Sequence, residues 1–401
     1  VYLSYLQKFL DNGPPTNQEE EREFTNMLES LVLDQTSIPL AVASGVRTLK
    51  DVRREDLDLR RLQEMEDALY RFFTARVGLR FLTEHHILSN PYREKPSKDD
   101  ELKRRLGTII DDEDNNAKDD FLGCIQKDCD PFKEVRRVAA KITKRCRECY
   151  GIAPEIEILD TTSEKNASLE FTYVPHHLRY MLAELLKNSC RATVRSYLKE
   201  ISSREDQKNT GSLQSPPPTL APIRVIVTKG DEDVSIKIAD QGGGVPRSAI
   251  KDMWTFAHFT QDDHQDTHES NTEFENDEIT GGQKIRGFGL PLARIYARYF
   301  GGELTLKSME GYGVDAYLYL PVLGVACENL PEKVVMSPGN LDSSANASRN
   351  DDGDDDDDVY DKSADRTTPD SSRIGDDLLW RRQMGTPSAR QTFEMLARRA
   401  L

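Results

Sequence analysis

The stretch PHHLRYMLAELLKNSCRATVRSYLK, from Pro175 to Lys199, decides the fold. Its apolar residues recur at the spacing of one buried helical face: Leu178, Met181, Leu182, Leu185 and Leu186. At about 100° per residue, the opposite face collects Tyr180, Glu184, Asn188 and Arg191. Helix stability alone does not require a carboxylate, a carboxamide and a guanidinium in one stripe. Two interpretations are open, a solvated outer face or a functional site.

The composition is that of a globular protein with two domains and additional polar segments. The 401 residues exceed the ~250 at which a single core stops growing, and 37% of them are hydrophobic. No apolar run approaches the ~20 residues of a membrane span, so we expect none. The net charge of −16, partly from the acidic run Asp351–Asp358, disfavours nucleic acid as a partner.

Six scattered cysteines suit a reducing compartment rather than a disulfide scaffold. Four of them have spacings that would also allow zinc, namely Cys124, Cys129, Cys146 and Cys149. The last two lie in a helical pattern with no turn to shape a metal site, which makes zinc the weaker interpretation.

Residues 1–150 have the periodicity of helices that pack on one another. Apolar positions at helical spacing cover residues 2–10, 19–33, 36–52 and 57–88, and another helix opens at Pro131. We therefore expect a helical bundle over residues 1–150.

The pattern changes after Gly151 to the alternation of strands. Residues 155–158, 169–173, 223–227 and 234–239 alternate apolar and polar side chains. Asp240 ends the last of these strands and Gly242-Gly243-Gly244 follows it. Such glycines let the backbone approach a flat ligand, with the carboxylate free to accept a hydrogen bond. A tight strand-to-helix turn is the competing interpretation.

A long polar loop, residues 247–286, leads to a second glycine turn. Its length is typical of a lid. Gly287-Phe288-Gly289-Leu290 then opens a helix, an arrangement that suits a phosphate because unpaired N–H groups point at the anion. A closing hairpin covers residues 303–320. The tail, residues 323–401, is mostly too polar for a core, with a basic amphipathic segment at 389–401.

The order of these signals resembles the ATP-binding domain of the GHKL superfamily of kinases and ATPases over residues 156–320. Within it the chain is similar to the mitochondrial 2-oxo-acid dehydrogenase kinases, of the pyruvate and branched-chain types. The matching motifs are Glu184–Asn188, Gly242–Val245, Gly289–Pro291, Gly311–Gly313, and residues 75–80 with His85-His86. The resemblance implies an α+β fold, a helical bundle at 1–150 and an α/β sandwich at 151–322.

By this resemblance the chain is a protein serine kinase that inactivates the dehydrogenase component of its complex. Glu184 is then the general base, Asn188 the Mg2+ ligand and Arg191 a supporting charge, while Asp240 accepts from the adenine amino group. The remaining nucleotide contacts implied are Gly242, Gly244, Thr260, Gly287, Phe288, Gly289 and Leu290.

The resemblance also implies ATP and Mg2+ as cofactors, with K+ as a further possible ion. It implies a homodimer that binds the lipoyl-bearing core of its complex in the mitochondrial matrix. The family has more sequence before the equivalent of Glu19, so we expect the N-terminus to be incomplete. Two positions depart from the family pattern, since Ile285 replaces a glycine and Val314 a threonine. Tyr180 stands where the pyruvate type has a histidine, as in the branched-chain type. The target, pyruvate or branched-chain, stays open.

Two rival functions are weighed against this one. A two-component histidine kinase needs a phospho-accepting histidine followed by an acid, but Ile87 follows His86. Packing in the bundle is the preferred role of His85 and His86. A nucleotide-binding scaffold without transfer activity has no need of Glu184, which argues against that reading.

Overall fold

The computed structural model describes residues 2–34, 59–91, 121–162, 170–208, 218–230, 232–256 and 287–324, with short pieces between 41 and 49. Most of the helix expected over 36–52 lies outside these ranges. So do Thr260, Ile285, nearly all of the expected lid, and the chain after residue 324.

Of the N-terminal region the structure describes the helices α1 (Tyr2–Asn12), α2 (Gln18–Asp34) and α4 (Leu59–Ser89), and the short pieces between 41 and 49 are also helical. The α2 helix begins where the side chain of Asn17 accepts a hydrogen bond from the Glu20 N–H at 3.0 Å, and three glutamates in its first turn favour the helix dipole. A small core joins these helices through Tyr5, Leu28, Leu31, Val32 and Ile87. The helices expected at these positions are confirmed.

A mixed five-stranded sheet forms the second part, in the order β3-β4-β5-β7-β6. The strands are β3 (Ile156–Asp160), β4 (Ile223–Lys229), β5 (Asp233–Ala239), β6 (Glu303–Met309) and β7 (Gly313–Pro321). Only β3 and β4 are parallel. The expected hairpins, β4–β5 and β6–β7, are confirmed, and alternate residues of each strand face the core.

The strand expected over 169–173 is wrong as a strand of this sheet. In the described part of this segment, residues 170–173, Tyr173 forms a bridge to Gln126 in a two-stranded hairpin of β1 (Phe121–Leu122) and β2 (Ile125–Gln126). The alternation there reflects burial, because Phe171 and Tyr173 stack on each other in the core with ring centroids 5.1 Å apart.

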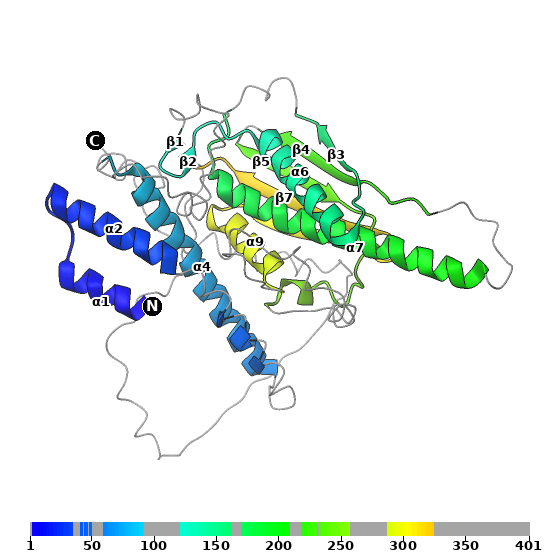
Figure 1. Cartoon of the computed structure of the whole chain (residues 1–401), viewed down its shortest axis with the longest axis horizontal. Coiled ribbons are helices and arrows are strands. Elements are labelled where there is room, and N and C mark those ends of the chain that lie inside the picture. Colours follow the sequence, from blue (N-terminus) through cyan, green and yellow to red (C-terminus); the bar gives the residue numbers. More distant parts are fainter. Residues whose placement is uncertain are drawn as a thin grey trace, which may run out of the picture.

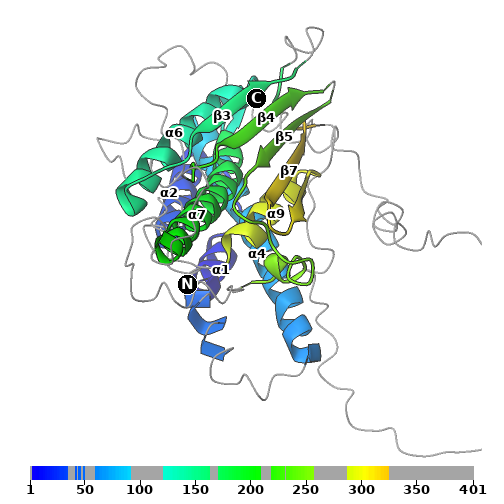
Figure 2. The ribbon, with the colours of Figure 1, turned by 90° about the vertical axis from the view of Figure 1, so that its right-hand side faces the viewer.

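Three helices cover one face of the sheet: α6 (Pro131–Tyr150), α7 (Pro175–Lys208) and α9 (Gly289–Tyr299). Figure 2 shows this helical layer between the sheet and the N-terminal helices, and Figure 1 shows α7 lying across the sheet. The α6 helix packs mainly on α7 and β3, although the sequence grouped it with the bundle. One hydrophobic core runs from α4 through α7 and α9 to the sheet.

The central helix α7 is buried on both sides. Tyr180 is only 4% exposed and Glu184 9%, because α9 packs against the face that carries them: the Tyr180 ring contacts Tyr296, and Glu184 lies against Gly289. The interpretation of the polar stripe as a solvated outer face is therefore wrong for these two residues, whereas Asn188 is exposed. Among the helices that the structure describes, none has the length and apolar character needed to span a bilayer.

Candidate functional site

Glu184 lies where α7 passes the first turn of α9. A methyl group added at Gly289 would collide with Oε2 of Glu184, so the carboxylate sits directly against the backbone that opens α9. On its other side Glu184 forms an ion pair with Lys187, one turn further along α7. The first turn of a helix stabilises an anion through its unpaired N–H groups and its dipole. The site therefore combines a mostly buried carboxylate, an ammonium and a helix N-terminus.

The opening of α9 offers backbone donors rather than side chains. Phe288 caps the helix without a side-chain hydrogen bond, and the first intrahelical bond runs from Leu292 N–H to the Phe288 carbonyl at 3.0 Å. Since Pro291 has no N–H, the unpaired donors of this turn are those of Gly289 and Leu290.

The side chains of the same turn point inward. Leu290 is 8% exposed, and Phe288 packs against Phe73 of α4 and Phe256 with ring centroids 5.8 and 5.4 Å away. Gly287 adopts φ 74°, which a side chain would strain. Of the four residues expected to cradle phosphates, Phe288 and Leu290 thus have only their backbone available.

Asp240 forms the other end of the site, at the end of β5. Its Oδ1 accepts from the N–H groups of Gly242 (3.0 Å) and Val314 (3.2 Å), and its Oδ2 accepts from Ser189 Oγ at 3.0 Å. A carboxylate has about four acceptor positions, so one remains for a ligand donor. Burial raises the pKa of Asp240, and these hydrogen bonds oppose that shift.

The turn after Asp240 is fixed against the β6–β7 hairpin. Gly243 exchanges backbone hydrogen bonds with Tyr312 and Gly311, at 3.1 and 2.8 Å. Gly244 has φ 70°, and a Cβ there would collide with the Met309 carbonyl. The requirement for glycine at this position thus has a local packing reason, besides the room for a base that the resemblance implies. A Cβ at Gly242 would likewise meet Ala192 of α7.

Arg191 and Asn188 lie on α7 between the two ends. Asn188 is exposed one turn after Glu184, where its amide oxygen is open to a cation. Arg191 hydrogen-bonds to Tyr150 of α6 and so joins two helices. The structure brings Glu184 together with Gly289, and Asp240 together with Gly242.

The sequence analysis assigned no role in the site to Lys187 and Ser189. Both flank Asn188, which is the one feature of the sequence that could have pointed to them. Lys187 forms the ion pair with Glu184, and Ser189 donates to the Asp240 carboxylate. Val314 also contacts the site through its main chain. Its carbonyl accepts a hydrogen bond from the Asp240 N–H, and its own N–H donates to Asp240 Oδ1. The missing hydroxyl at Val314 leaves those bonds intact.

Tyr180, the residue that departs from a histidine, is part of a buried polar cluster. Its ring lies 4.8 Å from that of Tyr296 on α9. Arg80 donates to Glu84 at 2.6 Å, and Glu84, Tyr296 and Tyr180 outweigh burial to raise the pKa of Arg80. His176 Nε2 lies 3.0 Å from the other oxygen of Glu84. This cluster joins α4, α7 and α9 behind the site.

The histidines of the bundle have packing partners. His86 Nε2 lies 3.3 Å from both Glu21 Oε1 and Thr25 Oγ1, and His85 Nδ1 lies 3.8 Å from Cys124 Sγ. In the described ranges no three His, Cys, Asp or Glu side chains are grouped as metal ligands, and the five described cysteines form no disulfide.

The fold and site define a class of protein. Residues 173–324 match the family model of the histidine kinase-, DNA gyrase B- and HSP90-like ATPases. This span begins just before α7 and ends just after β7, so it contains both ends of the site. The α+β fold expected from the sequence is confirmed.

Further comparisons narrow the class to a family. Residues 1–126 match the model named mitochondrial branched-chain alpha-ketoacid dehydrogenase kinase. A mitochondrial pyruvate dehydrogenase kinase of Arabidopsis thaliana is 32% identical over 82% of this chain and 76% of its own length. Isozyme 4 of Homo sapiens is 29% identical over 82% and 69%, and the Drosophila melanogaster kinase 29% over 80% and 68%. The chain belongs to the family of mitochondrial 2-oxo-acid dehydrogenase kinases.

Proposed function

We propose that this protein is an ATP-dependent protein serine kinase that phosphorylates the dehydrogenase component of a mitochondrial 2-oxo-acid dehydrogenase complex. The relatives are named as kinases of pyruvate dehydrogenase, whereas the model matched by residues 1–126 is named for the branched-chain enzyme. Both complexes are therefore candidate substrates. The observation that carries the proposal is Glu184 held at the opening of α9, with Asn188 exposed one turn further on.

The residues present fit ATP. Asp240 has an acceptor position left for the adenine amino group, and its Ser189 contact holds the carboxylate in place. The N–H groups of Gly289 and Leu290 suit the phosphates, and the absence of a Cβ at Gly289 leaves room beside Glu184. Gly242, Gly244, Gly287 and the unplaced Thr260 complete the proposed set of contacts.

The chemistry requires positioning more than covalent participation. Bound ATP supplies the phosphoryl group that is transferred. Glu184 takes the proton from the serine hydroxyl, while the amide oxygen of Asn188 would hold Mg2+ at the phosphates. Arg191 supports the helix that presents both groups, through its hydrogen bond to Tyr150.

The assembly proposed is a homodimer bound to the lipoyl-bearing core, in the mitochondrial matrix. The face of the sheet opposite the helices supports a dimer, because Tyr317 and Tyr319 are 39% and 45% exposed there. Lys237 pairs with Asp315 on the same face, at 2.7 Å. Exposed aromatic rings of this kind are enriched at protein interfaces.

The domain division proposed is a bundle over 1–150, an ATP-binding domain over 151–322 with a lid at 247–286, and a tail over 323–401. The boundary at residue 150 is a division along the sequence and not in space, because α6, which precedes it, packs on α7 and β3, which follow it.

The test is to incubate the full chain with purified pyruvate and branched-chain dehydrogenase complexes and labelled ATP. We expect acid-stable phosphoserine on one dehydrogenase component, and none with the Glu184→Ala variant. Acid-labile label on the kinase itself would support a histidine kinase instead. ATP binding without transfer to either complex would support a scaffold.

A further inference from the structure

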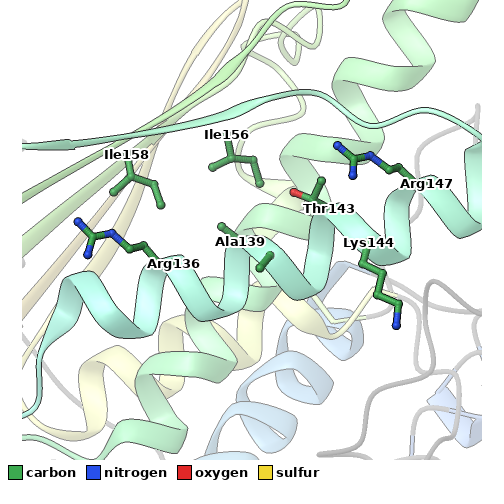
Figure 3. A pocket seen from close by; sticks show the side chains of 8 residues that line it. Arg136, Ala139, Thr143, Lys144, Arg147, Ile156 and Ile158 are labelled. Atoms are coloured by element: carbon green, nitrogen blue, oxygen red, sulfur yellow. The ribbon is translucent and has the colours of Figure 1, made fainter.

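A groove of about 390 Å³ lies between α6 and the edge strand β3, away from the site described above. Its floor is apolar, formed by Ile156 and Ile158 of β3. Its rim carries Arg136, Lys144 and Arg147 of α6. Figure 3 shows the two isoleucines turned toward α6, with Arg136 near one end of the groove and Arg147 near the other.

The rim is unusually basic for this protein. The α6 helix has seven basic residues and two acidic ones, in a chain with a net charge of −16. Arg136, Lys144 and Arg147 are exposed and recur at the spacing of one helical face. In the described part of the chain the side chains of Arg136 and Arg147 have no carboxylate partner, and Lys144 has only an exposed contact of 4.0 Å with Glu148. Fold stability therefore does not account for this row of cations.

The strand beneath the rim has an open edge. In the order of the described sheet β3 is outermost, with β4 as its one neighbour. The Glu155 carbonyl accepts from Ile223 and the Thr161 N–H donates to Val227, so the odd-numbered residues turn their backbone toward β4. The N–H groups of Ile156 and Ile158 therefore face outward. Such an edge recruits extended segments of chain.

We propose that this groove binds the acidic segment Asp351–Asp358 of the same chain. That segment has seven aspartates and one glycine, which complements three cations and outward N–H donors. Its carboxylates accept from the guanidinium groups of Arg136 and Arg147 and from the Lys144 ammonium, as charge-assisted hydrogen bonds.

The route of the chain supports an occupant in cis. Pro321, at the end of β7, pairs with Asp233 at the start of β5. The start of β5 in turn pairs with the end of β4, through Val234 and Lys229, and the end of β3 pairs with Val227 near the same end of β4. The chain thus leaves the sheet at the end where β3 also ends, three strands away or about 15 Å at the usual spacing. Residues 325–350 have a contour length of about 90 Å, and attachment in the same chain gives the segment a high effective concentration.

The experiment is zero-length carbodiimide coupling of the full chain, which joins a lysine amine to a carboxylate in direct contact. Peptide mapping by mass spectrometry should find Lys144 joined to a residue of Asp351–Asp358. We expect about tenfold more of this product than of the same segment joined to Lys251, an exposed lysine just before the short helix Asp252–Trp254. At 1 M salt, where the Debye length is about 3 Å, the preference for Lys144 should disappear.

The matched variant is Arg136→Glu with Arg147→Glu, which keeps the reporter Lys144. Both side chains are exposed, so the melting temperature should stay close to that of the wild type, while the Lys144 product should fall about tenfold. Hydrogen exchange gives a second readout: the Ile156 and Ile158 amides should exchange faster in a variant with the seven aspartates changed to asparagine.

Three outcomes would overturn the proposal. The first is equal coupling of the acidic segment to Lys144 and Lys251. The second is a product that, in a mixture of isotope-labelled and unlabelled chains, joins two different molecules. The third is unchanged exchange of Ile156 and Ile158 in the asparagine variant.

Discussion

The two ends of the α7 site are held in different ways. At the Asp240 end two backbone N–H groups and one hydroxyl fix the carboxylate, and the pairing of β5 with β7 sets their positions. At the Glu184 end a side-chain ion pair with Lys187 and the absence of a Cβ at Gly289 define the site. Backbone donors cannot be redirected without unfolding the sheet, whereas an ammonium can change partners by rotating about its own bonds.

This difference suits two tasks. A rigid acceptor at Asp240 can discriminate between bases, because a base without a donor would leave the one remaining acceptor position of this buried carboxylate unfilled. A carboxylate whose partner can move is available for proton transfer at the other end. The comparison predicts that changes near Glu184 reduce transfer and changes near Asp240 reduce nucleotide affinity.

The largest expected effect is that of Glu184→Gln. It removes the proposed base and keeps the shape, so phosphoryl transfer should fall about 10²- to 10⁴-fold. Nucleotide affinity, measured by calorimetry, should change little. A variant that transfers phosphate at the wild-type rate would remove Glu184 from its role.

Gly289→Ala should come next. The new methyl group meets Oε2 of Glu184, and displacing a reacting group by about 1 Å costs on the order of 10²-fold in rate. Gly45→Ala is the matched control, since nothing lies within 4 Å of that position. In the Glu184→Ala variant the new methyl group meets no carboxylate, so Gly289→Ala should change ATP affinity and stability much less than it does in the wild type. Equal effects of Gly289→Ala in the two backgrounds would contradict the contact.

Asp240→Asn should weaken ATP binding by about 1.5–3 kcal/mol, the range for hydrogen bonds to a charged group. The amide places a donor where two backbone N–H groups already donate. Ser189→Ala removes one neutral donor and should cost about 0.5–1.5 kcal/mol. Titration calorimetry with ATP measures both, and a larger loss for Ser189→Ala than for Asp240→Asn would reverse the assigned order.

The smallest expected effect concerns pH and His177, a buried histidine in the first turn of α7 whose ring packs against Tyr296 of α9. Burial, together with the nearby charges of His176 and Arg80, holds the pKa of His177 well below its usual value. As pH falls below about 6.5, the unfolded chain takes up a proton that the folded chain refuses. Stability from His177 is therefore complete above that pH and is lost below it, at up to about 1.4 kcal/mol per pH unit.

Chemical denaturation at pH 7.5 and 5.5 measures this effect. The difference in the free energy of unfolding should shrink in His177→Gln. An unchanged difference would show that other groups carry the acid sensitivity.

The sequence predicted the elements well and their burial less well. The periods of 3.6 and 2 located α2, α4, α6, α7 and the hairpins, because each has a strong repeating pattern. The same periodicity left both a solvated stripe and a functional site possible on α7, since one helix does not report what packs against its polar face. Only tertiary structure shows that α9 covers Tyr180 and Glu184.

The site was predicted at its strand end and its helix start, where glycines mark close approach. Lys187 and Ser189 could not be chosen on sequence alone, because a lysine or a serine on a helix is common and its partner lies elsewhere in the chain. For Arg191 the resemblance implies a supporting charge, and the structure adds a hydrogen bond to Tyr150 of α6 that the sequence does not show.

The aromatic cluster of Phe73, Phe256 and Phe288 determines how the protein unfolds. Phe73 belongs to α4, yet its ring stacks on Phe256 at 5.2 Å and meets Phe288 at 5.8 Å, so N-terminal helix and kinase site share one core. Cutting the chain at residue 150 would expose both halves of that core to water. The two parts are therefore expected to unfold in a single cooperative transition, and neither would be a folding unit on its own.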